Sequence, residues 1–590
     1  MGHLPVQPLR LRAGLLLLLM TGTFAHPASA AIWTWTGRGT NDNWSLPANW
    51  TPAGPPHSDY TTTLVFDGTL RLGPVQDLLD AFQFGSLVFS ATAGGFQLGG
   101  ASNAFGQAAW RSLQFAGCSA SLSVQGSNNV VIHGALVTPS AASTQTISVA
   151  SGLTLQVPWI LGGQHRQVVK KGGGTLRVYE SDAGQRYLQN SCTVGPEYCV
   201  EDGTIEMGTC TDRYVLASDG SGWQADPVEV KASYSLTVGN GEGGPTSAVI
   251  RLIGPSQQTA QLLDNNLYIM VNADGLLDFN GVQDWCRNSD DPLHLTISNG
   301  LVRLGGSSLY VRNGRMLDLR GSARIDGSGP TAIRFYDGAT NLVDGLDSCV
   351  VVAADAALVR ADNVTGVVFQ ISGHTGDVAA LEMTGHLGAG GAGSHLVKRG
   401  PGTMAIANLT HALRTNRVEE GTLLIRGLSQ CCSSGAGAQW LVASNATLGG
   451  AGTISNAAVV VQGGTIDPGD AAAGTLTIAA DLQLGTGATL AFDLTPSDRN
   501  SDCMADQLVL QNGNLSGLSN ATLRLDVQAQ ANVDGKTFRV ISGGGDYTGT
   551  AFRMVAVTGV DGRRALVNAG VGYIDVTIQN LQLGTILIIR

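Results

Sequence analysis

The chain has 590 residues, of which 80 are glycine and only 13% are charged. An average globular protein has about 7% glycine and about 25% charged residues. The hydrophobic share of 43% is too high for a disordered chain, and 19 prolines are too few for collagen. The formal net charge of −11 argues against nucleic acid or an anionic membrane as a partner, because both attract basic surfaces.

Residues 1–30 have the three zones of a secretory signal peptide in the required order. Arg10 and Arg12 form a basic flank, a leucine-rich run follows, and residues 28–30 (Ala-Ser-Ala) are a small-residue cleavage site. No later stretch approaches the ~20 apolar residues that a transmembrane helix needs. We therefore expect export, no integral membrane segment after cleavage, and a mature net charge of −13 once the two arginines are removed from −11.

Residues 31–70 hold the densest aromatic cluster of the chain, Trp33, Trp35, Trp44 and Trp50. Tryptophan rings either cover an open apolar surface or stack on sugars, since both need a large flat ring. One hypothesis is an N-terminal cap, and the other is a glycan-contact platform. We favour the cap, because every stack of repeats must protect its first edge.

Residues 71–480 contain short alternating runs, closed by Gly, Asn, Asp or Ser, that are typical of strands with one buried face. Within them the block VKKGGGTL at 169–176 recurs as VKRGPGTM at 397–404. A second block follows in both copies, as VEDGTI at 200–205 and VEEGTL at 418–423. This paired order defines two repeat units, near 165–208 and 395–427.

Two patterns between the repeat units have the form of functional motifs. Residues 239–244 match G-x-G-x-x-G, but Pro245 and strand-like residues follow where a nucleotide-binding helix would begin, which indicates a glycine corner. The acidic candidates are Asp274, Asp278, Asp284, Asp290 and Asp291, beside Trp285. Paired carboxylates can cleave a glycosidic bond, but the interleaved glycines are typical of turns, so we expect corner aspartates.

The C-terminal third continues the Gly-Thr-aliphatic pattern at 452–454, 464–466 and 474–476. Four aspartates there, Asp467, Asp470, Asp502 and Asp506, offer oxygen ligands of the kind that calcium takes, but no calcium-binding loop surrounds them. We predict no catalytic residue, no cofactor and no metal site. Residues 481–590 form either further coils or a β-rich end domain.

These units predict an all-β chain dominated by a right-handed parallel β-helix with an atypical N-terminal cap. Inward residues of each coil stack on those of the next, about 4.8 Å away, which favours small aliphatic side chains. Outward threonines form ladders, and low charge avoids repulsion between like charges on successive coils. At roughly 20–25 residues per coil, about twenty coils make a rod on the order of 100 Å long.

The two units resemble the autotransporter-associated β-strand repeat, or passenger-associated transport repeat, whose pattern is K-x-G-x-G-T-L, then N, then T-x-V-x-x-G-x-L. The matching residues of the first unit are Lys170, Gly172, Gly174, Thr175, Leu176, Val200 and Gly203. Those of the second are Lys398, Gly400, Gly402, Thr403, Asn408, Val418, Gly421 and Leu423. The departures are Met404, Arg414 and Asn416. The resemblance implies a secreted or surface-displayed β-helix, here without the C-terminal translocator barrel.

We expect a non-catalytic structural or adhesive role at a bacterial cell surface or in the extracellular space, with surface glycans or other cell-surface proteins as partners. The alternative is an extracellular β-helix that binds or degrades polysaccharides. That alternative requires a groove lined by Trp or Tyr together with two or more carboxylates. The positions of Trp285, Asp274, Asp278 and Asp284 distinguish the two hypotheses.

Overall fold

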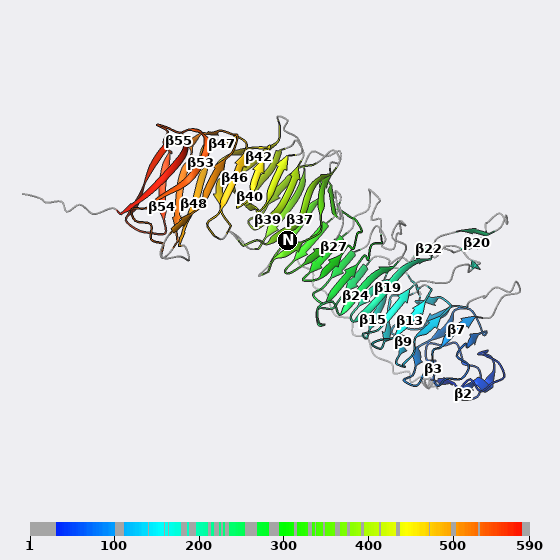
Figure 1. Ribbon diagram of the computed structural model, residues 1–590. Coiled ribbons are helices and arrows are strands. Elements are labelled where there is room, and N and C mark those ends of the chain that lie inside the picture. The colour runs from blue at the N-terminus through cyan, green and yellow to red at the C-terminus, as the bar shows by residue number, and fades with distance from the viewer. Residues whose placement is uncertain are drawn as a thin grey trace, which may run out of the picture.

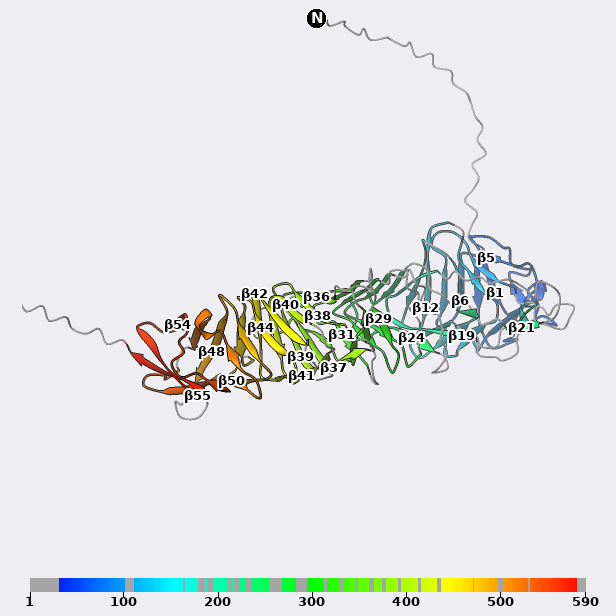
Figure 2. The same cartoon turned by 90° about the horizontal axis from the view of Figure 1, so that it is seen from above.

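The computed structural model describes most of the chain after residue 30. The described residues are 31–100, 111–139, 141–158, 160–162, 165–178, 186–187, 196–210, 214–216, 223–225, 228–229, 235–253, 268–282, 294–311, 316–327, 333–336, 338–345, 348–359, 366–373, 378–390, 394–411, 415–431, 437–470, 472–496, 503–528 and 531–580. The described chain winds along one axis into an elongated rod, with N-terminal strands at one end and C-terminal strands at the other (Figure 1 and Figure 2). The signal-peptide prediction for 1–30 lies outside the described residues.

The rod is a parallel β-helix, which confirms the predicted fold class. Apart from the 3₁₀ turns η1 (Pro47–Asn49) and η2 (Leu518–Asn520), its described elements are strands that form three faces. The first face consists of β1 (Ile32–Trp35), β3 (Thr63–Phe66), β6 (Ser86–Phe89), β9 (Ser121–Val124), β12 (Ser143–Val149), β15 (Arg166–Lys171), β18 (Glu197–Val200), β23 (Ser235–Val238), β25 (Tyr268–Val271), β27 (His294–Ser298), β30 (Met316–Arg320), β33 (Thr340–Asp344), β36 (Val367–Ser372), β38 (Leu396–Arg399), β40 (Thr415–Ile425), β42 (Gln439–Gly450), β44 (Ala458–Val461), β47 (Leu482–Leu484) and β51 (Leu515–Ser516).

The long strands β40 and β42 belong to two faces: their first halves lie on the first face and their second halves on the second face. Its other strands are β4 (Val75–Gln76), β7 (Gln97–Gly100), β10 (Val130–Ile132), β13 (Thr154–Val157), β16 (Thr175–Val178), β19 (Gly203–Cys210), β24 (Ala248–Ile253), β26 (Gly275–Asp278), β28 (Leu301–Arg303), β31 (Arg324–Asp326), β34 (Val350–Val352), β37 (Leu381–Gly390), β39 (Thr403–His411), β45 (Thr465–Pro468), β48 (Thr489–Pro496), β52 (Thr522–Val527) and β54 (Met554–Thr558). The third face consists of β5 (Phe82–Phe84), β8 (Leu113–Phe115), β11 (Leu136–Val137) and β14 (Ile160–Leu161), and further along of β29 (Leu309–Val311), β32 (Ile333–Tyr336), β35 (Ala356–Val359), β41 (Leu428–Cys431), β43 (Thr453–Ser455), β46 (Thr475–Ala479), β50 (Gln507–Leu510) and β53 (Thr537–Asp546).

The first face passes through eighteen parallel pairings between described strands, from β1 to β51. At about 4.8 Å per pairing the coils span about 86 Å, close to the length expected from the sequence. The stack begins at β1, inside the region expected to be a cap, and runs past residue 480 through β48, β52 and β54.

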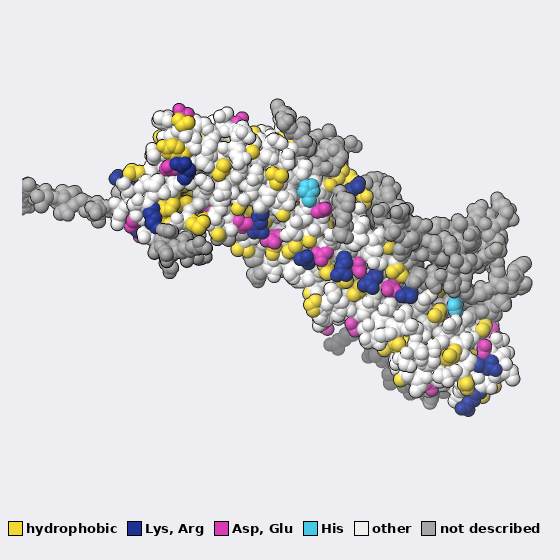
Figure 3. All heavy atoms as spheres, viewed as in Figure 1, with side chains coloured by type: hydrophobic (Ala, Val, Ile, Leu, Met, Phe, Trp, Pro, Cys, Tyr) yellow, Lys and Arg dark blue, Asp and Glu magenta, His cyan; other side chains and the backbone are white. Residues whose placement is uncertain are grey.

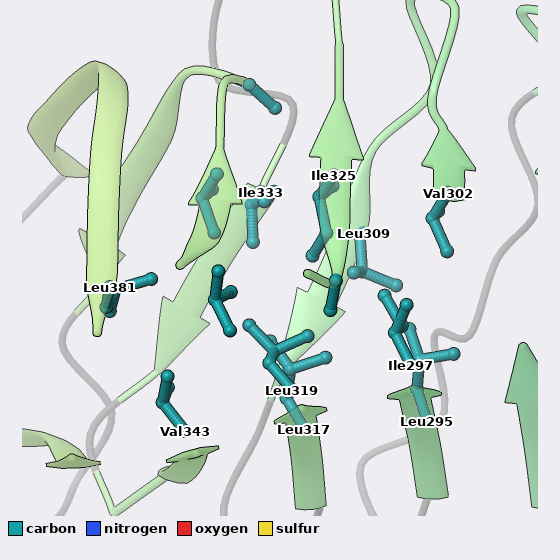
Figure 4. Packing of buried hydrophobic residues seen from close by; sticks show 14 of the residues in the cluster. Leu295, Ile297, Val302, Leu309, Leu317, Leu319, Ile325, Ile333, Val343 and Leu381 are labelled. Atoms are coloured by element: carbon teal, nitrogen blue, oxygen red, sulfur yellow. The ribbon is translucent and has the colours of Figure 1, made fainter. Parts of the chain in front are cut away.

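Apolar side chains point inward at every second position and stack in register from coil to coil (Figure 4). On the first face Leu295 lies over Leu317, and Ile297 lies over Leu319. On the second face Val302 lies over Ile325. All six side chains are buried, and burial of each stabilises the fold by about 1.5–3 kcal/mol. The narrow core explains why small aliphatic residues dominate the composition.

A ladder of threonines runs along the second face, at the start of β39, β45, β48 and β52 and within β40 and β42. Its members are Thr403, Thr422, Thr447, Thr465, Thr489 and Thr522, each opposite the next in register. A shorter ladder joins Thr154, Thr175 and Thr204. The Gly-Thr-aliphatic pattern at 402–404, 421–423 and 464–466 therefore lies at one corner of the coil, whereas alanine precedes Thr447, Thr489 and Thr522.

Antiparallel strands are added at both ends of the rod. β2 (Trp50–Thr51) pairs antiparallel with β1, and β55 (Arg563–Asn580) pairs antiparallel with β53. Smaller antiparallel additions are β22 (Val228–Glu229) on β19 and β49 (Cys503–Ala505) on β48. Beside the rod, β17 (Arg186–Tyr187), β20 (Tyr214–Leu216) and β21 (Trp223–Ala225) form a small separate sheet.

Candidate functional site

The lysine of each repeat unit points into the core of the rod. Lys170 is the last but one residue of β15 and Lys398 the last but one of β38, and both side chains are fully buried. The stem of Lys170 stacks between Ile147 and Val200 of the neighbouring coils. The stem of Lys398 stacks in the same way between Phe369 and Val418. Each four-carbon stem thus takes the place of an aliphatic core residue.

Each buried ammonium group donates hydrogen bonds to three backbone carbonyl oxygens. Lys170 Nζ lies 2.9 Å from the oxygen of Lys171, 2.5 Å from that of Gly172 and 3.1 Å from that of Asp202. Lys398 Nζ lies 3.4 Å from the oxygen of Arg399, 2.5 Å from that of Gly400 and 2.7 Å from that of Glu420. We call each arrangement a lysine clamp. Two of its carbonyls belong to the lysine's own turn and the third belongs to the next coil.

Burial lowers the pKa of both clamp lysines. The pKa of Lys170 falls to about 8 and that of Lys398 to about 7, because taking an ammonium group out of water disfavours its charged form. The neighbouring acidic residues, Asp202 and Glu420, oppose this shift without cancelling it.

The glycines of the motif make room for the clamp. Gly421 has a φ of +68°, and a Cβ placed on it would lie 2.4 Å from the carbonyl oxygen of Gly400 and 2.6 Å from Lys398 Nζ. Gly203 occupies the matching position, with a φ of +74° and Lys170 Nζ 2.7 Å from its Cβ position. Glycine is therefore required in the second block both by the backbone and by the close approach of the first block.

The same two coils are also joined on the outside. Lys171 and Glu201 form an ion pair at 2.9 Å, and Arg399 and Glu419 form the equivalent pair at 2.7 Å. The strands that follow pair in register, with Thr175 opposite Thr204 and Thr403 opposite Thr422. The two sequence blocks thus lie in adjacent coils. The buried lysine joins the coils on the inside, and the ion pair joins them on the outside.

Three of the four N-terminal tryptophans pack against one another at the first end of the rod, and the fourth packs against a histidine. Trp35, Trp44 and Trp50 are buried, with the Trp50 ring 5.1 Å from Trp35 and 5.5 Å from Trp44. Trp50 Nε1 donates to the carbonyl oxygen of Trp44 at 2.9 Å. Trp33 is also buried and packs edge-on to His57. Rings buried in this way do not present a face to a sugar, so the structure supports the cap over the glycan-contact platform.

The two described aspartates of the enzyme hypothesis are both buried and engaged in the fold. Asp274 accepts hydrogen bonds from the backbone N–H of Gly241 at 2.8 Å and of Asn240 and Gly243 at 3.3 Å. It thereby holds the 239–244 loop, which is a glycine corner as predicted. Asp278 pairs with Arg251. Asp284, Trp285, Asp290 and Asp291 lie outside the described residues.

The described aspartates of the calcium hypothesis also have partners within the protein. Asp470 pairs with Arg426, and Asp506 accepts from the backbone N–H of Gly474 at 2.7 Å and of Asp493 at 2.8 Å. Asp467 lies on β45, and Asp502 is outside the described residues. Among the side chains that the structure describes, no group of three or more His, Cys, Asp or Glu is arranged to hold a metal ion.

A row of alternating charges, which we call the charge ladder, runs outward along the second face. Its rungs are Arg177, Glu206, Arg251, Asp278, Arg303 and Asp326, each opposite the next in register. Arg177 Nε lies 2.7 Å from Glu206, and Asp278 lies 3.2 Å from Arg251 and 3.7 Å from Arg303. A row of alternating basic and acidic side chains is visible along the middle of the rod in Figure 3. The alternation avoids the like-charge repulsion that stacking would otherwise impose.

Sequence reasoning did not find the ladder, because its rungs recur at irregular intervals. Arg177 and Glu206 are 29 residues apart, and Arg251 and Asp278 are 27 apart. The interval between Glu206 and Arg251 is longer, at 45 residues (251 − 206). Insertions in single coils shift the interval, so no fixed period links the rungs. The sequence does contain one signal for the ladder, a charged residue two positions after the threonine of the repeat. Arg177 follows Thr175 in this way, and Glu206 follows Thr204.

Comparison with known proteins gives no family name, since no family model and no curated protein matches the chain. Over the part of the chain that the structure describes, no helix has the length and apolar content needed to cross a bilayer. The likeness of the two repeat units to the passenger-associated transport repeat therefore rests on their own residues.

Proposed function

We propose that the protein is an exported, non-catalytic rod of the cell surface or extracellular space, with a structural or adhesive role. The observation that carries the proposal is the unbroken stack of coils from β1 to β54, since such a stack presents a long repetitive surface. The signal-peptide pattern at 1–30 and the resemblance of 165–208 and 395–427 to the passenger-associated transport repeat support export.

Cell fractionation of the organism that makes the chain tests this proposal. We expect the protein in the outer-surface or medium fraction, with an N-terminus at Ala31 by mass spectrometry of the purified chain. Surface-exposed protein should also be cleaved when intact cells are treated with protease. Retention of residues 1–30 together with a cytoplasmic location would contradict the proposal.

The alternative function, polysaccharide binding, is favoured by one observation, the outward arginines of the charge ladder. Among the described residues nothing comparable favours polysaccharide degradation, because Asp274 and Asp278 are buried and bonded to other residues of the protein. Binding to a glycan is compatible with the adhesive role, since it identifies what the rod adheres to.

A further inference from the structure

The charge ladder has equal numbers of arginines and acidic residues, but the two are not equally exposed. The side chains of Glu206 and Asp278 are only 13% and 6% exposed. The side chains of Arg177, Arg251 and Arg303 are 34%, 38% and 47% exposed. The third acidic rung, Asp326, is 31% exposed and pairs with Arg324 on its own strand. Between Arg177 and Arg303, however, the carboxylates lie deeper than the guanidinium groups, so the guanidinium groups form the solvent-facing layer of this part of the ladder.

The three arginines are evenly spaced. One acidic rung separates Arg177 from Arg251, and one separates Arg251 from Arg303. Two coil steps of about 4.8 Å place successive guanidinium groups about 9.6 Å apart in a straight line. Two sugar rings of an extended polysaccharide chain have a comparable length. A linear chain lying along the rod thus meets one guanidinium group for every second sugar.

We propose that Arg177, Arg251 and Arg303 bind an extended acidic polysaccharide that carries one anionic group on every second sugar. Guanidinium groups suit this task, because they donate paired hydrogen bonds to carboxylate or sulfate oxygens. The acidic rungs supply selectivity: an anion on every sugar would place a negative charge over Glu206 and Asp278. The proposal rests on the adhesive function put forward above and names its ligand class.

Ionic strength sets the range of this attraction, so the overall negative charge of the protein does not prevent it. Charges further than about 8 Å apart are largely screened at physiological ionic strength, so the ligand responds to the ladder rather than to the distant acidic residues. The binding is therefore short-ranged, and it weakens as salt is added.

The test uses the purified mature chain and three polysaccharides of different charge spacing. Hyaluronan carries one carboxylate on every second sugar, polygalacturonate carries one on every sugar, and dextran carries none. The ladder variant is Arg251→Gln combined with Asp278→Asn, which removes the ion pair without leaving a buried charge. The matched control is Arg320→Gln combined with Asp318→Asn, which removes an ion pair of 2.5 Å with an equally buried aspartate on the first face.

We expect hyaluronan segments long enough to reach all three arginines to bind more tightly than polygalacturonate, with no binding of dextran. The ladder variant should lose at least about tenfold in affinity, since a hydrogen bond to a charged group typically contributes that much. The control variant should bind like the wild type. Circular dichroism of both variants verifies that the β-helix is intact.

Absence of hyaluronan binding, tighter binding of polygalacturonate, or equal losses in the two variants would each overturn the proposal. So would a dimer in sedimentation that dissociates only in the ladder variant, because the ladder would then face a second copy. These outcomes are independent of the proposed location. A cytoplasmic chain that binds hyaluronan refutes the adhesive function alone, and a surface chain that does not bind it refutes the ligand alone.

Discussion

Lys170 and Lys398 show how one side chain joins two coils. Each ammonium group donates to carbonyl oxygens of its own glycine turn, and it reaches one carbonyl oxygen of the following coil. An unsatisfied buried carbonyl costs about 1–3 kcal/mol, so the clamp offsets several such costs at once. The lysine is therefore part of the turn and not a surface charge.

Replacing Lys398 by Met keeps the length of the stem but removes every donor of the clamp. We expect local opening of β39 and β40 to become easier by about 1–3 kcal/mol, because the buried carbonyl oxygen of Gly400 and the partly buried ones of Arg399 and Glu420 lose this donor. Hydrogen exchange measured by mass spectrometry over 396–425 reports this directly. Arg399→Met, which removes only the outer ion pair, is the control and should cost less than about 1 kcal/mol. Equal protection in the two variants would refute a stabilising clamp.

The clamp also predicts how stability depends on pH. The pKa of Lys398 is about 7 in the folded chain, whereas an unfolded lysine titrates near 10.4. Between these values the unfolded chain binds one proton more than the folded chain, so stability gained from this group rises as pH increases from about 7 to about 10. Chemical denaturation at several pH values should show the wild type gaining stability relative to Lys398→Met across this window. Parallel curves for the two proteins would contradict the shifted pKa.

At the scale of the element, the repeat motif is a pair of adjacent coils rather than one unit. The first block supplies the lysine and a turn, and the second supplies the carbonyl acceptor and the glycine that lets the turn approach. Gly203 and Gly421 are thus fixed by contacts that belong to the preceding coil. This explains why the blocks keep their order while the segment between them varies in length.

Glycine is required at 421 for two reasons, the left-handed backbone and the close approach of the preceding coil. The variants Gly421→Ala and Gly152→Ala separate these two reasons. Both glycines have a left-handed backbone, with φ of +68° and +79°, but no atom lies within 4 Å of the Cβ position of Gly152. Alanine at 152 should cost about 1–2 kcal/mol from the backbone alone. Alanine at 421 should cost about 1–3 kcal/mol more, because its Cβ meets two carbonyl oxygens and the clamp. Thermal denaturation of both variants checks the order, and equal midpoints would refute the close approach.

The sequence predicted the coil, the glycine corners and the threonine ladder, because each depends on residues close together in the chain. The role of Lys170 was not predictable, since its third acceptor, Asp202, lies 32 residues away in the next coil. Asp278 does lie at a corner, since its carboxylate accepts from the backbone N–H of Asn280 at 3.0 Å, but its second role was not predicted. It is the last residue of β26 and a rung of the charge ladder, and its partners depend on a register that coils of unequal length conceal.

At the scale of the whole molecule, each coil contacts its neighbours and little else. Stability of such a rod is approximately a sum of coil terms and interface terms, so damage stays local. The N-terminal coil is the most aromatic: Trp35, Trp44 and Trp50 surround Phe66 on β3. It covers the first open edge of the stack.

Trp44→Ala should therefore unravel one end and spare the rest. Truncating a buried tryptophan costs about 3–5 kcal/mol, which exceeds what a terminal coil can lose and remain paired. We expect hydrogen-exchange protection to fall in β1, β3 and β6 and to stay unchanged beyond β38. Trp440→Ala, a buried tryptophan in the interior strand β42, is the matched control and should open coils around 415–461 only. Loss of protection along the entire rod in either variant would contradict nearest-neighbour stabilisation.

The antiparallel strands β2 and β55 have a consequence for size. A parallel stack with bare edges would accept further copies and lengthen with concentration, as fibrils do. The strand β2 covers the outer edge of β1, and β55 covers the outer edge of β53, both in the opposite direction, so one edge at each end of the described rod is closed to a further parallel strand. These two strands oppose end-to-end growth, and deleting one winding is expected to shorten the rod by about 4.8 Å.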